Sequence, residues 1–154
     1  MQVIVATDGS KASLLAAQQF MSFADPGKIE EVVIVAVVSP LAVVPFENEL
    51  SRRTAPRSAD EAVDLSFEAE ARAATGSLMA QFDGWGPAVS RRLRSGSPAS
   101  EIIKVAEELP ADLIVVAAGA RGLSSTILIG STAQKLQHSA PCPVLVGRRA
   151  PHQK

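Results

Sequence analysis

Two short stretches of this chain are apolar at every position, and they restrict its fold more than any other feature. They are Val32–Val38 and Leu113–Ala118, both rich in β-branched residues. A strand with one solvent-exposed face alternates apolar and polar side chains, whereas a strand buried on both faces is apolar throughout. Both stretches are far shorter than the roughly 20 residues that cross a bilayer. They are therefore predicted to be central strands of a parallel sheet covered by helices.

The rest of the chain alternates between strand-like and helix-like segments. Three more strands are expected, at Val3–Ala6, Val89–Arg94 and Val144–Val146. Helices are expected after Ser10, from about Ser58 to Phe82, after Ser97 and from about Ser131 to Ser139. Successive strand–helix–strand units have right-handed crossovers and parallel strands. The sequence therefore predicts one α/β domain over residues 1–149, with a doubly wound, five-stranded parallel sheet and helices on both faces, and a short tail at 150–154.

The sequence also predicts finer features of these elements. Ser10 and Ser97 are expected to cap helices. Three arginines within Val89–Arg94 place that strand at a sheet edge, where charge discourages pairing with other chains. Residues from about Ser39 to Arg57 are expected to form a long, mobile loop. The apolar faces of the first two helices are expected to consist of Ala12, Leu15, Ala16, Phe20 and Phe23, and of Leu65, Ala69, Ala73, Gly76 and Ala80.

The charge of the chain is balanced, with 15 basic and 16 acidic side chains. A nucleic-acid-binding domain usually carries a strongly basic face, and single-strand binders need aromatic platforms, but this chain has no tyrosine and one tryptophan. No basic leader precedes the first apolar run, and the single Cys142 cannot form an internal disulfide. We therefore expect a cytoplasmic protein that binds neither nucleic acid nor membranes, with Cys142 as a buried, inert thiol.

Two loops carry residues suited to ligand binding. In doubly wound sheets, ligands bind beyond the carboxyl ends of the strands. Thr7–Ser10 follows the first predicted strand, and the Gly/Ser-rich stretch Gly119–Gly130 follows the fourth. Ser131 and Thr132 stand at a predicted helix start, where unpaired backbone N–H groups and the helix dipole attract anions. These residues are equally compatible with a phosphate site and with a capped helix that follows a flexible loop.

Five motifs, in this order and spacing, resemble the universal stress protein family over essentially the whole chain. They are Val3–Ser10, Gly96–Ala99 with Ile102, Ala111–Val116, Gly130–Ala133 and Ala140–Val146. The resemblance implies the strand order 3-2-1-4-5, and a homodimer formed through the last strand. That strand, Val144, Leu145 and Val146, is expected to be an exposed apolar edge that a two-fold mate could cover.

Many members of that family bind ATP through the pattern G-x-x-G-x9-G-[S/T], and the glycine loop of this chain is altered. Counted without gaps, the first two glycine positions fall on Ala117 and Ala120. Aligned on Gly119 and Gly122, both glycines are restored but only seven residues precede Gly130. Gly130 and the serine after it are intact in both alignments.

The resemblance implies a set of ATP-binding residues, and Mg²⁺ could accompany the nucleotide. The base is assigned to Ala6, Thr7, Asp8 and Val37. The ribose is assigned to Ala117, Gly119 and Gly122, and the phosphates are assigned to Gly130, Ser131 and Thr132. Arg121 is equally compatible with a phosphate contact and with a position in solvent.

Other doubly wound nucleotide or phosphate binders are excluded by their missing signatures. A receiver domain needs clustered acids after the first strand, a flavodoxin needs a hydroxyl-rich phosphate loop where Asp8 stands, and a Walker nucleotidase needs a lysine after its glycine loop. No histidine–carboxylate cluster has metal-ligand spacing, so neither a metal site nor a catalytic residue is assigned. The expected function is ATP binding by a stress-response regulatory protein with little or no turnover. The alternative is a dimeric interaction module of the stress response that binds protein partners and no nucleotide.

Overall fold

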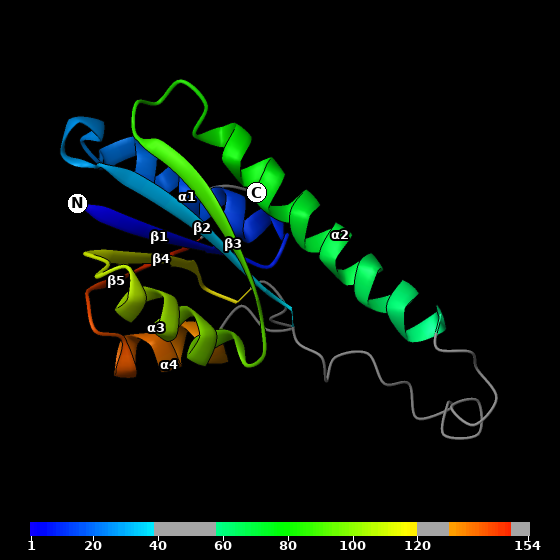
Figure 1. Ribbon diagram of the computed structural model, residues 1–154. Coiled ribbons are helices and arrows are strands. Elements are labelled where there is room, and N and C mark those ends of the chain that lie inside the picture. The colour runs from blue at the N-terminus through cyan, green and yellow to red at the C-terminus, as the bar shows by residue number, and fades with distance from the viewer. Residues whose placement is uncertain (39–57, 120–129, 149–154) are drawn as a thin grey trace.

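The computed structural model describes residues 1–38, 58–119 and 130–148, and within these ranges strands and helices alternate as predicted (Figure 1). The strands are β1 (Gln2–Thr7), β2 (Glu31–Val38), β3 (Ala88–Ser95), β4 (Leu113–Ala117) and β5 (Val144–Gly147). The helices are α1 (Lys11–Phe23), α2 (Ser58–Gln81), α3 (Pro98–Glu108) and α4 (Ser131–Ser139), with a short 3-10 helix at Pro26–Lys28. The loop predicted at Ser39–Arg57 lies outside the described residues.

The five strands form one parallel sheet in the order β3-β2-β1-β4-β5, which confirms the predicted fold class and strand order. β1 lies at the centre, where Val5 pairs with Ile34 of β2 and with Val115 of β4. All three side chains are fully buried. The two all-apolar runs thus lie in the strands that flank β1, because each of them has a strand on either side and a helical layer on both faces.

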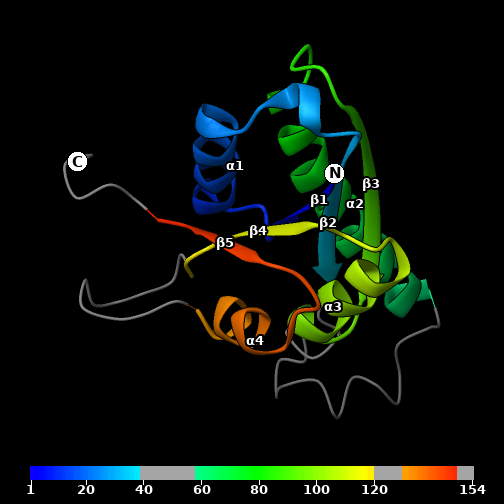
Figure 2. The ribbon, with the colours of Figure 1, turned by 90° about the vertical axis from the view of Figure 1, so that its left-hand side faces the viewer.

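Helices cover both faces of the sheet and divide the core into two layers (Figure 2). One layer packs α1 and α2 against side chains such as Val5 and Ile34, with Phe20 and Phe82 among its largest members. The other packs α3 and α4 against the opposite face, with Ile4 at its centre. Among the described residues, no helix combines the length and the apolarity that a membrane crossing requires.

The buried face of α2 differs from the predicted one. Ala69, Ala73 and Ala80 are exposed, Gly76 is half-buried, and the side chain of Leu65 lies outside the described residues. The buried positions are instead Ala71, Thr75 and Leu78, together with Phe82 directly after the helix. Burying a large side chain such as Leu or Phe contributes far more than burying a methyl group, so the two large residues decide which face packs. The buried hydroxyl of Thr75 is satisfied, since it donates to the carbonyl of Ala71 at 2.9 Å.

Two smaller predictions about helices also need correction. Phe23, expected on the apolar face of α1, is 66% exposed, although its ring lies edge-on against that of Phe20. Ser10 caps α1 as predicted, because its side chain accepts from the N–H of Ser13. Ser97 occupies the N-cap position of α3, but its side chain makes no capping hydrogen bond.

The two edges of the sheet have opposite character. β3 lies at one edge, as its arginines predicted. Arg92 and Arg94 both form ion pairs with Glu108 of α3, the first at 3.3 Å. β5 lies at the other edge, and its three residues Val144–Val146 are half-buried and uncharged. The charged edge opposes strand addition, whereas the apolar edge does not.

The end of β5 is held against α1 by a close contact and by a pair of hydrogen bonds. A Cβ atom added to Gly147 would collide with the Cβ of Ala16 and would lie 2.6 Å from its Cα, so glycine is required for this approach. One residue later, the N–H of Arg148 donates to Oε1 of Gln19 at 3.0 Å, and the amide Nε2 of Gln19 donates to the carbonyl of Arg148.

We expect Gly147→Ala to lower the free energy of unfolding by about 1–3 kcal/mol, because the added methyl group overpacks the β5–α1 contact. Equilibrium urea denaturation of the two proteins measures the difference. Gly76→Ala is the matched control: nothing lies within 4 Å of the added Cβ, and alanine is favoured over glycine in a helix, so this variant should be more stable by about 0.5–1 kcal/mol. Unchanged stability of Gly147→Ala would contradict the contact.

Candidate functional site

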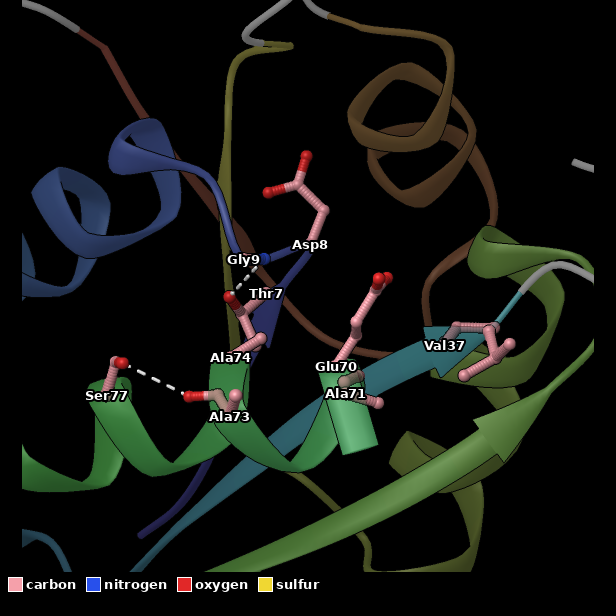
Figure 3. Close-up of a pocket in the computed structure, with 11 residues that line it drawn as sticks. Thr7, Asp8, Gly9, Val37, Glu70, Ala71, Ala73, Ala74 and Ser77 are labelled. Carbon is pink, nitrogen blue, oxygen red and sulfur yellow. Dashed lines mark hydrogen bonds between the residues drawn. The ribbon is translucent and has the colours of Figure 1, made fainter. Parts of the chain in front are cut away.

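A cleft of about 610 Å³ opens at the carboxyl ends of β1 and β2 and is walled on one side by α2 (Figure 3). Its volume lies within the range of pockets that hold small molecules, roughly 300–1,000 Å³. Three groups of residues line it, from the end of β1, the end of β2 and the middle of α2. They are Thr7, Asp8 and Gly9; Ala36, Val37 and Val38; and Glu70, Ala71, Ala73, Ala74 and Ser77.

The length of α2 explains why a helix forms one wall. With 24 residues the helix is about 36 Å long, whereas the eight residues of β2 span about 26 Å. A helix packed along the strand must therefore extend beyond the sheet, and Figure 1 shows α2 continuing past the end of β2. At this boundary five α2 residues line the cleft above the strand ends: Glu70, Ala71, Ala73, Ala74 and Ser77.

A chain of hydrogen bonds fixes the turn between β1 and α1. The N–H of Gly9 donates to Oγ1 of Thr7 at 3.1 Å, and Thr7 and Ser13 share a buried hydroxyl–hydroxyl bond of 2.8 Å. The Ser13 hydroxyl donates its proton to the carbonyl of Ser10 at 2.7 Å, so in the shared bond Thr7 is the donor. Both buried hydroxyls therefore have partners, and the turn presents Asp8 at the cleft in one conformation.

Gly9 needs its glycine for two reasons. Its φ of +81° lies in the left-handed region, which side chains other than glycine rarely adopt. An added Cβ would also lie 3.2 Å from the Cβ of Ala74 on α2. The turn after β1 thus packs directly on the helix that forms the opposite wall, and this contact sets the width of the cleft.

Two carboxylates provide the charge of the cleft. Figure 3 shows Asp8, from the turn after β1, and Glu70, from α2, extending to the same side. Oδ1 of Asp8 accepts from the N–H of Ser10 at 2.9 Å, which holds this carboxylate in place. Among the described lining residues none is basic. Ionised carboxylates accept hydrogen bonds and repel anions, so the cleft suits a ligand part with N–H or O–H donors and disfavours a phosphate.

A second region, at the end of β4, is built around a contact between two glycine backbones. A Cβ on Gly119 would lie 2.9 Å from the Cα of Gly130, and a Cβ on Gly130 would lie 2.9 Å from the Cα of Gly119. Gly130 is the N-cap of α4, and its carbonyl accepts the first helical hydrogen bond, from the N–H of Gln134 at 3.0 Å. The start of α4, with its first-turn N–H groups, is thereby fixed close to the end of β4.

The predicted site residues fall into three sets. Thr7, Asp8 and Val37 line the cleft, and Ala6 is buried in the core next to Thr7. Ala117 ends β4, and Gly119, Gly130, Ser131 and Thr132 form the second region at the same edge of the sheet. Arg121 and Gly122 lie outside the described residues. Ala120, the second glycine position of the ungapped alignment, also lies outside the described residues, and Gly119 is the packing partner of Gly130.

Sequence reasoning missed the wall that α2 contributes. Glu70 and the small residues Ala71, Ala73 and Ala74 line the cleft, yet the helix was expected only to cover the sheet. The one available signal was the length of the helix, because a helix much longer than its strand must reach the carboxyl edge. Within the described residues, no group of three or more His, Cys, Asp or Glu side chains is placed to hold a metal ion.

Comparison with known proteins finds the same family over nearly the whole chain. The model of the universal stress protein family matches residues 1–148. A universal stress protein of Methanocaldococcus jannaschii is 30% identical over 149 residues, covering 96% of this chain and 82% of that protein. The solved structure of the universal stress protein UspA from Lactobacillus plantarum has a TM-score of 0.73 at 24% identity, covering 96% of this chain and 97% of that one.

Two further solved structures contain nucleotides. A universal stress protein family member from Arabidopsis thaliana, with AMP bound, has a TM-score of 0.66 at 15% identity and covers 98% of this chain and 93% of that one. A universal stress protein in complex with cAMP has a TM-score of 0.56 at 21% identity and covers 97% and 98%. At these identities the likeness establishes the shared fold.

Cys142 is half-buried rather than buried, and burial together with the nearby charge of Asp112 raises the pKa of its thiol. Because the thiolate is the reactive form, we expect iodoacetamide to alkylate Cys142 more slowly than a free cysteine at the same pH. The alkylation rate of Cys142 should also reach its half-maximum at a higher pH than the alkylation rate of free cysteine does. Mass spectrometry of quenched samples measures both.

Asp112→Asn should speed this alkylation at a given pH, because it removes the charge that opposes thiolate formation while its amide oxygen can still accept from the N–H of Gln2. Asp83→Asn, on the exposed turn after α2, is the control and should leave the rate unchanged. If the alkylation rate of Cys142 reached its half-maximum at the same pH as that of free cysteine, or at a lower pH, the raised pKa would be contradicted.

Proposed function

The chain belongs to the universal stress protein family, and we propose that it binds an adenine nucleotide, ATP, in the cleft between β1, β2 and α2. In this proposal the protein is a regulator of the stress response that changes its interactions with protein partners when the nucleotide binds. Its own turnover of the nucleotide is slow or absent.

The observation that carries the proposal is the cleft itself, at the carboxyl ends of two adjacent strands. This is the edge at which doubly wound sheets bind ligands. The cleft combines an apolar floor, from Ala36 and Val37, with the acceptor oxygens of Asp8 and Glu70. A purine base is flat, largely apolar on its faces and bears N–H donors on its rim, so it suits this lining. The AMP and cAMP bound to proteins of the same fold support an adenine nucleotide.

The phosphates belong at the start of α4 in this proposal. The carboxylates of Asp8 and Glu70 would repel them from the cleft, whereas the first-turn N–H groups and the hydroxyls of Ser131 and Thr132 are donors. β1 and β4 are neighbours in the sheet, so the cleft and the start of α4 both lie at the carboxyl end of the sheet. Mg²⁺ would have the phosphate oxygens as its main ligands.

Slow turnover is proposed from the character of the side chains around the cleft. Nucleotide hydrolysis needs a base or a metal positioned beside the terminal phosphate. The titratable side chains among the described lining residues are Asp8 and Glu70, and both stand at the proposed base end. His138 lies in the last turn of α4, far along the helix from Ser131.

A homodimer through β5 is the second part of the proposal. Its support is the contrast between the edges of the sheet: β3 carries three arginines, whereas Val144, Leu145 and Val146 are apolar and half-buried. A two-fold mate placed along β5 would cover these side chains and satisfy the outer backbone groups of both strands.

The nucleotide is tested first on the protein as purified. Mass spectrometry of the small molecules released by denaturation should find ATP, and ATP titrated into stripped protein should bind with about one nucleotide per chain. Ala73→Trp should abolish this binding, because Ala73 is exposed, lines the cleft and would place an indole in it. Ala80→Trp is the matched control, on an exposed position of the same helix away from the cleft, and should bind ATP as the wild type does.

Substitution of Gly130 is less informative than Ala73→Trp, since a side chain there collides with Gly119 whether or not a ligand binds. No released nucleotide, and no binding at millimolar ATP with Mg²⁺, would overturn the nucleotide proposal and favour the interaction module without a ligand. Equal binding by Ala73→Trp and the wild type would remove the cleft as the site.

The dimer is tested by sedimentation velocity at micromolar concentration, which should give twice the chain mass of 16.1 kDa. Leu145→Arg should shift the protein to monomer, because it places on β5 the kind of charge that keeps β3 unpaired. Arg91→Ala, on the opposite edge, should leave the dimer intact, and circular dichroism of both variants checks that they fold. A monomeric wild type would overturn this part of the proposal.

A further inference from the structure

The position of Glu70 gives the cleft a feature that the sequence motifs did not point to. Glu70 projects from the middle of α2, beside Ala71 of the same wall and near Val37 of the floor (Figure 3). It therefore borders the half of the cleft next to β2. Asp8 borders the half next to β1, and one of its oxygens already accepts from the backbone of Ser10. The two carboxylates thus approach a bound ligand from different walls.

The chemistry of Glu70 restricts what can lie beside it. An ionised carboxylate has acceptor oxygens and no donor, so a ligand edge facing it must supply N–H or O–H groups. The described lining residues include no basic side chain that would neutralise this charge. A carbonyl oxygen or a phosphate at that point would be repelled and would have no hydrogen-bond partner there.

Two residues earlier on the same helix, Glu68 shows the contrasting arrangement. Its carboxylate forms an ion pair with Arg72 one turn later at 2.9 Å, and both side chains are about half exposed. Glu68 does not line the cleft. The helix thus carries two nearby glutamates, of which one faces an arginine and the other faces the cleft.

We propose that Glu70 is a specificity-determining residue that selects 6-aminopurine nucleotides over 6-oxopurine nucleotides by accepting a hydrogen bond from the exocyclic amino group. This inference rests on the proposed nucleotide site and deepens it. Adenine carries an N–H₂ donor at position 6, whereas hypoxanthine carries an acceptor oxygen there, which the carboxylate would reject. Glu70 is exposed, so its carboxylate stays hydrated when no donor faces it, and the expected discrimination is that of one hydrogen bond to a charged group.

The test compares the affinities of AMP and IMP for the full-length protein by calorimetric titration. The wild type should prefer AMP by about tenfold, the order expected for one hydrogen bond to a charged group at an exposed position. Glu70→Gln keeps the length of the side chain, but its amide can either accept from an amino group or donate to a carbonyl. The affinities of this variant for AMP and IMP should therefore differ by no more than about twofold. Glu68→Gln, the matched control, should keep the wild-type preference.

The outcomes separate this inference from the proposed function. A wild type that binds AMP and IMP equally, or a Glu70→Gln variant that keeps the wild-type ratio, would overturn the role of Glu70 and leave the nucleotide site standing. Tighter binding of GMP than of AMP would overturn it as well, because the carboxylate would then pair with the two donors of guanine. If neither AMP nor ATP binds the wild type, the proposed function fails and the inference fails with it.

Discussion

The pairing of β1 with β2 on one side and β4 on the other is the constraint on which the rest of the structure depends. A strand in this position is buried by its neighbours along both edges and by helices on both faces, so its side chains must be apolar. Polar groups can gather only where the strand ends. The turn after Thr7 is that point, and it is where the cleft, the buried hydroxyls and the Asp8 carboxylate occur together.

Close approaches to glycine backbones help to place the other elements at the carboxyl end of the sheet. Gly9 packs on Ala74 and fixes the cleft wall, Gly119 packs on Gly130 and fixes the start of α4, and Gly147 packs on Ala16 and fixes the end of β5. At Gly119, Gly130 and Gly147 the approach is too close for a side chain on the glycine, and at Gly9 an added Cβ would make a tight contact. Glycines that resemble a ligand-binding motif therefore also carry a packing role, which a substitution at those positions would disturb together with any binding.

The carboxyl end of the sheet has two parts, and their different charges favour different ligand groups. The cleft holds two acceptor carboxylates above an apolar floor, while the start of α4 offers donors and the positive end of a helix. A ligand with a donor-bearing, flat end and an anionic end would match both. This division is why the proposed nucleotide has one orientation along the edge, with its base toward α2.

The sequence by itself determined the fold class, the strand order implied by the family resemblance, the edge position of β3 and the placement of Thr7, Asp8 and Val37 at the ends of their strands, where the cleft lies. These follow from local patterns, since a strand buried on both faces must be apolar and a turn must follow it. Only the tertiary structure decided which face of α2 is buried, that Gly119 meets Gly130, and that Glu70 reaches the cleft. The buried face of α2 and the position of Glu70 depend on how a long helix of small residues rotates and overhangs the sheet. The packing of Leu78 and Phe82 sets that rotation, which alanine-rich periodicity leaves open. The contact of Gly119 with Gly130 depends on how close the start of α4 lies to the end of β4.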